Sequence, residues 1–203
     1  MKKFWILAAC AVAVTWPVLA PAQTDEALGA GGARIKMAYL GFTDSILDDY
    51  RIDHPTYVGL EAYWKIHPQL YVGGEVGYAN QDSSAGILVG MVWRRAETEI
   101  TYVPIELNVM NIIPFGEHVQ TRFGIGVSYS YVHIESDPPP GGIMLKSSDN
   151  DEEWLIGGQL FADINYHINN FFFGVDVKLQ ITSDWGAEDY SNGRIGGHLG
   201  WGF

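Results

Sequence analysis

The fold is decided by the stretch Phe171–Thr182, FFFGVDVKLQIT. Every second residue is apolar, and the intervening positions include Asp176, Lys178 and Gln180. A period of two over this length predicts a β-strand, because successive side chains point to opposite faces of a sheet. One face is wholly apolar and the other is charged. The pattern therefore fits either a soluble sandwich, whose core covers the apolar face, or a membrane barrel, whose apolar face meets lipid.

Seven further stretches alternate in the same way: residues 34–42, 56–66, 70–80, 99–111, 119–134, 154–166 and 194–203. The connections between the eight stretches are long and short in turn. This order predicts an all-β fold, an eight-stranded antiparallel transmembrane β-barrel with short periplasmic turns and long extracellular loops.

Outward aromatic residues collect at the two ends of these stretches. Those near the long connections are Phe42, Tyr78, Tyr129, Tyr131 and Trp154, and those near the short turns are Trp64, Tyr166, Phe171 and Phe203. Two such belts are typical of proteins that cross a membrane, where aromatic rings sit at the headgroup level. A soluble barrel has no reason to sort its aromatic residues by height, so the pattern favours the membrane barrel.

Two stretches complicate this assignment. Residues 87–93 are an apolar run inside the long segment 81–98. We interpret the run as a strand extension above the membrane, because another crossing would give an odd number of strands. Pro104 lies inside a predicted strand and cannot donate a hydrogen bond to its neighbour, so we expect a β-bulge there.

Residues 1–22 are predicted to be a secretory signal peptide. Lys2 and Lys3 precede an apolar run that begins at Phe4, and Ala20-Pro21-Ala22 has the pattern of a cleavage site. A lipoprotein signal is the alternative, since Leu7-Ala8-Ala9-Cys10 matches a lipoprotein cleavage box. The apolar run continues well beyond that box, which favours the first interpretation.

Cleavage after Ala22 would leave 203 − 22 = 181 residues. We assign residues 23–33 to a periplasmic lead-in and residues 34–203 to one barrel domain. Cys10 is the only cysteine, so the mature protein would contain neither a disulfide nor a thiol nucleophile.

Composition supports a membrane barrel and argues against some partners. The chain is 47% hydrophobic and only 18% charged, yet it has no apolar run after the signal that could form a membrane helix. Without Lys2 and Lys3, 10 basic residues face 24 acidic ones, a net charge of −14. Nucleic acid is therefore excluded as a natural partner. The excess acid predicts acidic loops, or a surface that meets divalent cations between lipopolysaccharide phosphates.

The sequence also resembles a known group of proteins. Tyr102-Val103-Pro104-Ile105-Glu106-Leu107-Asn108, Phe123-Gly124-Ile125-Gly126-Val127-Ser128-Tyr129, and residues 154–170 with Gly157, Gln159, Asp163 and Tyr166 carry the resemblance. They are similar to the small outer-membrane β-barrel proteins of the OmpX/OmpW-like group, over roughly residues 34–203.

This resemblance implies a location in the outer membrane of a Gram-negative bacterium. It also implies contact with outer-membrane lipid and lipopolysaccharide. Ile195, Leu199, Trp201 and Phe203 share one face of the last predicted strand. They resemble the C-terminal signal that the barrel assembly machinery recognises in such proteins.

Ten charged residues are predicted to face the barrel interior. The acids are Glu61, Glu75, Glu106, Asp163 and Asp176, and the bases are Lys36, Lys65, Arg122, Lys178 and Arg194. The interior of an eight-stranded barrel is just wide enough for side chains, and a buried charge needs a partner. We therefore expect a self-neutralising plug in which Asp176 pairs with Lys178 or a nearby base such as Arg194. A proton or ion path through the same residues is the alternative.

No catalytic, cofactor-binding or metal-binding residues are predicted. His67, His118 and His167 fall in three separate short turns, which do not bring their nitrogens to one ion. His198 faces inward beside the charges. Asp189-Tyr190-Ser191-Asn192 is similar to the His-x-Ser-Asn of lipid A deacylases, but Asp189 stands where a general base is required.

The sequence therefore predicts a non-enzymatic outer-membrane barrel with a plugged interior and acidic surface loops. A narrow channel for small or hydrophobic solutes, as in OmpW-like relatives, is the alternative. A lipid A-modifying enzyme is a third hypothesis.

Overall fold

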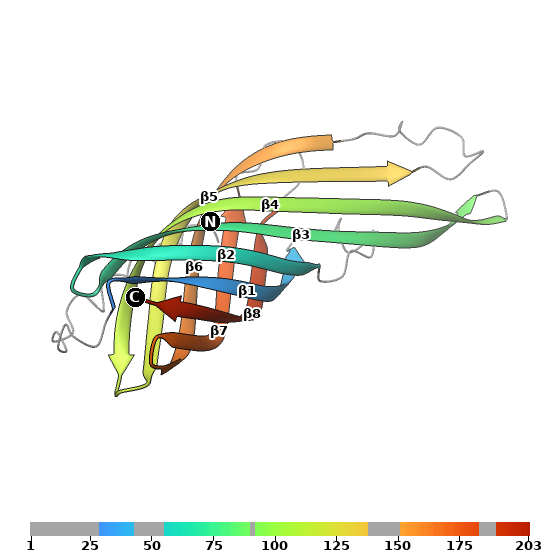
Figure 1. Cartoon of the computed structure of the whole chain (residues 1–203). Coiled ribbons are helices and arrows are strands. Elements are labelled where there is room, and N and C mark those ends of the chain that lie inside the picture. The colour runs from blue at the N-terminus through green and yellow to red at the C-terminus, as the bar shows by residue number, and fades with distance from the viewer. Residues whose placement is uncertain (1–28, 43–54, 90–91, 138–150, 183–189) are drawn as a thin grey trace, which may run out of the picture.

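The chain forms a closed barrel of eight antiparallel strands (Figure 1). The computed structural model describes residues 29–42, 55–89, 92–137, 151–182 and 190–203. The strands are β1 (Gly31–Phe42), β2 (Thr56–His67), β3 (Leu70–Val89), β4 (Val92–Phe115), β5 (Val119–Asp137), β6 (Asp151–Ile168), β7 (Phe171–Thr182) and β8 (Asn192–Gly202). Each strand pairs with the next, and β8 pairs with β1. The predicted fold class is confirmed.

The alternation seen in the sequence divides the barrel wall into two faces. On β7, Val175 and Val177 are 62% and 47% exposed, whereas Asp176 and Lys178 are buried. The same division holds along the other strands, so large apolar side chains cover the outside, and the charged and polar side chains lie inside together with a second set of buried apolar ones. An apolar outer wall of this extent is what a bilayer requires of a barrel. The described residues include no helix of the length and apolarity needed to span a membrane.

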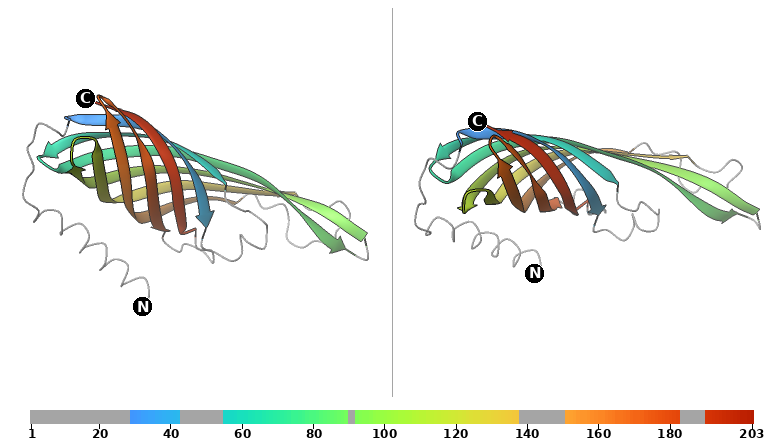
Figure 2. Two further views of the ribbon diagram at one scale, coloured as in Figure 1. Left: turned by 90° about the horizontal axis from the view of Figure 1, so that it is seen from below. Right: turned by 60° about the horizontal axis from the view of Figure 1, so that its bottom comes forward.

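β3, β4, β5 and β6 continue beyond the closed part of the barrel, and β3 and β4 are the pair described here. β2 stops pairing with β3 at Thr56 and Asn80, but β3 and β4 remain paired as far as Val89 and Val92. Figures 1 and 2 show β3 and β4 reaching far past the shorter strands. The predicted strand extension at residues 87–93 is confirmed for its described residues. It lengthens the β3–β4 hairpin and adds no crossing.

The expected bulge at Pro104 is wrong. The β4–β5 register runs through Pro104 and Ser130 without a shift. On the β3 side, pairing lapses between Ile105 and Tyr102 and then resumes in the same register. The missing N–H of Pro104 therefore interrupts the pairing of β4 with β3 locally, but no extra residue is inserted. The register shift that does occur lies between Lys65 and His67, next to the short β2–β3 turn.

The first strand begins at Gly31, three residues before the predicted start. Gly31 and Gly32 pair with Trp64 and Tyr63 of β2, and Gly31 exchanges two backbone hydrogen bonds of 2.9 Å with Phe203. Glycine carries no side chain, so these residues gave no alternating signal. The predicted signal peptide, residues 1–22, lies outside the described residues.

Candidate functional site

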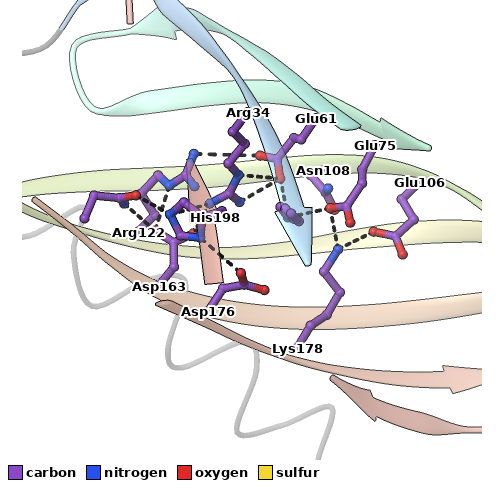
Figure 3. Close-up of polar contacts among 12 residues, drawn as sticks. Arg34, Glu61, Glu75, Glu106, Asn108, Arg122, Asp163, Asp176, Lys178 and His198 are labelled. Carbon is purple, nitrogen blue, oxygen red and sulfur yellow. Dashed lines mark hydrogen bonds and ion pairs between the residues drawn. The ribbon is translucent and has the colours of Figure 1, made fainter. Parts of the chain in front are cut away.

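The interior contains a continuous chain of ion pairs between strands that are far apart in the sequence (Figure 3). At its start, Arg34 of β1 pairs with Glu61 of β2 at 2.6 Å and with Asp163 of β6 at 2.9 Å. The Arg122 Nε of β5 donates to the same Asp163 at 2.8 Å. Each of these side chains is buried, so every charge depends on its neighbours rather than on water.

The chain continues toward the long-loop end through alternating acids and bases. The Lys36 ammonium contacts Glu61 at 2.5 Å and Glu75 at 2.6 Å. Lys178 contacts Glu75 at 2.7 Å and also pairs with Glu106, which in turn pairs with Arg194. Most of these carboxylates are shared by two cations. A substitution at one position therefore disturbs several partners.

Asp176 has a different partner from the one expected. Its carboxylate lies 3.1 Å from Nδ1 of His198, and the other ring nitrogen of His198 lies 2.5 Å from Oδ1 of Asn165. Lys178 instead reaches across the interior to the acids of β3 and β4. The narrow interior brings the side chains of facing strands into contact, so a long side chain such as that of Lys178 can reach acids on other strands.

The structure confirms the five inward acids and four of the five predicted bases. Lys65 lies near the end of β2, is only partly buried and is absent from the buried set. Arg34 takes its place, so five buried acids still face five buried bases. Arg34 was missed because the predicted strand started at that residue. Arg34 lies two positions before Lys36, so the two side chains share one face of the strand. This spacing was the signal that could have identified Arg34 as an inward base.

Apolar layers lie above and below these charges. The layer at the long-loop end contains Ala38, Leu40, Tyr57, Ala79, Ile100, Tyr102, Val132, Leu155 and Tyr190, and the layer at the short-turn end contains Tyr63, Tyr71, Met110, Ile112, Phe161 and Phe172. On β2, β3 and β4 the acid stands between members of the two layers, as Glu61 does between Tyr57 and Tyr63. The charged region is therefore enclosed between two layers of packed side chains.

Inward glycines make room for the rings of these layers. A β-carbon on Gly77 would overlap the phenol ring of Tyr57, and one on Gly200 would overlap the ring of Phe172. The hydroxyl of Tyr57 donates to Glu75 at 2.6 Å, so this ring joins the apolar layer to the ion network.

Part of the hydrogen-bonding capacity of the interior is not used by the protein groups that the structure describes. Arg122 Nη1 lies 3.8 Å from Glu61, and Arg194 Nη1 lies 3.7 Å from Glu75. Neither nitrogen has a hydrogen-bond partner among the described residues. Polar atoms separated by such distances are commonly bridged by water.

His118, in a short turn, and His167, near the end of β6, take no part in the ion pairs described above. His118 packs against Tyr166, and His167 stacks on Phe172. Within the described ranges, no three His, Cys, Asp or Glu side chains are arranged to hold a metal ion.

Ser191 is buried, and its hydroxyl accepts a hydrogen bond from the Thr182 amide at 3.2 Å. Asp189 lies outside the described residues.

No protein-family model and no curated protein matches the sequence. Solved structures do match. Neisserial surface protein A is 10% identical and superposes with a TM-score of 0.56, covering 85% of this chain and 96% of that one. OprG from Pseudomonas aeruginosa is 16% identical, with a TM-score of 0.51 over 87% of this chain and 98% of that one.

The N-terminal β-barrel domain of Pseudomonas aeruginosa OprF also gives a TM-score of 0.51, at 10% identity over 86% of this chain and 99% of that one. Identities this low establish the fold alone. The resemblance seen in the sequence is thus confirmed at that level: this chain has the fold of the small eight-stranded outer-membrane β-barrels.

Proposed function

We propose that this protein is a non-enzymatic barrel of the Gram-negative outer membrane, with a closed interior and a role at the cell surface. The observation that supports this most is the chain of buried ion pairs from Asp163 to Arg194, which links strands all round the barrel. Such a network holds the wall together from within, and each of its carboxylates is already paired with at least two bases among the described residues.

The two apolar layers support the same proposal. An eight-stranded barrel is narrow enough for side chains to fill it, and here one packed layer lies on each side of the charged region. The outside of the barrel would contact outer-membrane lipid and lipopolysaccharide. Exposed acids near the long-loop end, among them Glu99, Glu135 and Glu152, would form part of an acidic outer surface.

A narrow channel is the second candidate function, and one observation favours it. Arg122 and Arg194 each keep guanidinium nitrogens without a hydrogen-bond partner among the described residues. Water at these nitrogens would begin a hydrated path along the network. The ion pairs would then line the path rather than close it.

Conductance in planar bilayers separates the two functions. If the barrel is closed, purified wild-type protein should give no steady current above the bilayer background. The Glu106→Gln variant, which removes a shared carboxylate, should remain silent wherever it folds. If the residues line a channel, the wild-type protein should conduct and Glu106→Gln should reduce its preference for cations. A stable open current from the wild-type protein would refute the closed barrel.

A further inference from the structure

His198 of β8 lies among three polar side chains of the barrel interior, and two of them contact the same ring nitrogen (Figure 3). Nδ1 lies 3.1 Å from the carboxylate of Asp176. Nε2 lies 2.5 Å from Oδ1 of Asn165 and 3.3 Å from Nη1 of Arg34. The His198 side chain is fully buried, so these groups decide where its protons are placed.

The chemistry of the first two neighbours fixes what each ring nitrogen must do. An ionised carboxylate only accepts hydrogen bonds, so Nδ1 carries a proton toward Asp176. Nδ2 of Asn165 donates to Asp163 at 2.6 Å, which turns the amide oxygen of Asn165 toward His198. An amide oxygen also only accepts, so this contact requires a proton on Nε2.

Arg34 requires the opposite state of the same nitrogen. A guanidinium only donates hydrogen bonds, so its contact with Nε2 needs a bare lone pair. Arg34 and Asn165 therefore cannot both form hydrogen bonds with Nε2 at one time. A ring with one proton, on Nδ1, can accept from Arg34, whereas a ring with two protons can donate to Asn165.

The charges around His198 leave room for the second proton. Within the described residues, the ion pair of Asp176 is with His198 and with no lysine or arginine. Arg34 and Lys36, which is level with His198 in the β1–β8 register, are each held by two carboxylates. The charged side chains that face this part of the interior are thus three acids and two permanent bases: Asp176 of β7, Asp163 of β6, Glu61 of β2, and Arg34 and Lys36 of β1.

We propose that His198 is a proton-operated switch inside the barrel. The lone pair of Nε2 takes up one proton from solvent, the hydrogen bond from Arg34 breaks, and a hydrogen bond to Asn165 forms. Without the proton, His198 links β8 to β1, its neighbour at the point where the barrel closes. With the proton, it links β8 to β6, across β7. This inference does not depend on whether the barrel conducts.

The experiment follows the ring nitrogens of His198 by nitrogen NMR. The folded protein, with isotope-labelled histidine and arginine, is titrated in detergent micelles from about pH 4 to pH 9, a range that brackets the ordinary charge change of histidine. A bare ring nitrogen resonates far from a protonated one, so the spectrum reports the state of Nε2 directly. His198→Gln identifies the signal by its loss, and the guanidinium signal of Arg34 is the second readout.

As the pH falls, Nε2 should change from bare to protonated, and the Arg34 signal should move with the same midpoint. Asn165→Leu removes the acceptor that the protonated ring uses. It should therefore lower the midpoint by about one to two pH units, the effect of one hydrogen bond to a charged group.

Asn108→Leu is the matched control. Asn108 is an inward amide that is buried like Asn165, but its hydrogen bond is with Gln159. This substitution should leave the midpoint of His198 unchanged.

Two results in the wild-type protein would overturn the proposal: an Nε2 that keeps one state over the whole range, or an Arg34 signal that does not follow it. Equal midpoints for Asn165→Leu and Asn108→Leu would also overturn it, because His198 would then titrate without exchanging Arg34 for Asn165. If Asn165→Leu does not fold, the joint titration of His198 and Arg34 in the wild-type protein decides the question.

Discussion

Replacing Glu106 by glutamine tests whether charge balance stabilises the closed barrel. Glu106 pairs with Lys178 and Arg194 and accepts a hydrogen bond from Gln159 at 2.9 Å. In the variant, Lys178 keeps Glu75 at 2.7 Å, but the remaining carboxylate of Arg194 lies 3.7 Å away, beyond hydrogen-bonding distance. One buried positive charge is left in excess, centred on Arg194.

Removing one partner of a buried ion pair costs about 3–5 kcal/mol. Since Lys178 keeps a partner, we expect Glu106→Gln to lower the free energy of unfolding by about 3 kcal/mol, the lower end of that range. Adding Lys178→Met restores the balance to four acids and four bases. The double variant should then recover about 1–2 kcal/mol relative to the sum of the two single variants.

Urea titrations in lipid vesicles, followed by tryptophan fluorescence, measure these free energies. Asp176→Asn is the comparison: it also removes one of the five buried acids, but the hydrogen-bond partner of its carboxylate is His198 rather than a lysine or arginine. It should cost only about 1–2 kcal/mol. If the double variant loses as much stability as the two single variants together, charge balance does not stabilise this barrel.

Three further predictions concern the outer face of β7, the packing of the interior and the C-terminal residue. Val177→Arg places a charge on the lipid-facing side of β7 and should cost about 2–4 kcal/mol in the same titration, whereas Val177→Leu should be nearly neutral. Gly77→Ala should lower the free energy of unfolding by about 1–3 kcal/mol, because the new β-carbon displaces the ring of Tyr57. Gly158→Ala, whose new β-carbon meets nothing within 4 Å, should leave the stability unchanged. Equal effects of the two substitutions would refute the packing explanation. Phe203→Ala should lower the amount assembled in cells more than the yield of refolding in detergent, and an unchanged amount in cells would contradict an assembly signal at this residue.

Most of the fold could be predicted because the alternation of side chains is set by local geometry. Lys36 and Lys178 were placed inside by parity alone, without knowledge of any contact. The extension of β3 and β4 was also within reach, since residues 87–93 continue an antiparallel hairpin. The start of the first strand at Gly31 could not be predicted from the alternation, because glycine has no side chain to mark a face.

The pairing inside the barrel could not be predicted in the same way. Parity says that Asp176 faces inward, but its partner depends on the tilt and stagger of strands across the interior. With the tilt and stagger of this barrel, His198 lies next to Asp176, and Lys178 pairs with Glu75 and Glu106. The prediction of a bulge at Pro104 was wrong for a related reason. The missing N–H of proline predicts a lost hydrogen bond at that position, but the register of the surrounding strands decides whether an extra residue is inserted.

The distribution of charge among the strands has a consequence for how the barrel forms. The inward acids stand on β2, β3, β4, β6 and β7, whereas the first and last strands, β1 and β8, contribute only bases: Arg34, Lys36 and Arg194. An open sheet of β2–β7 would hold five acids against Arg122 and Lys178, a net charge of 2 − 5 = −3.

Adding β1 and β8 to this sheet brings the three missing positive charges. A sheet without these two strands would thus carry an excess of negative charge that lipid does not tolerate. The charge pattern would therefore favour a chain whose first and last strands are both in place, so that the complete set of eight strands is the one that fits a membrane.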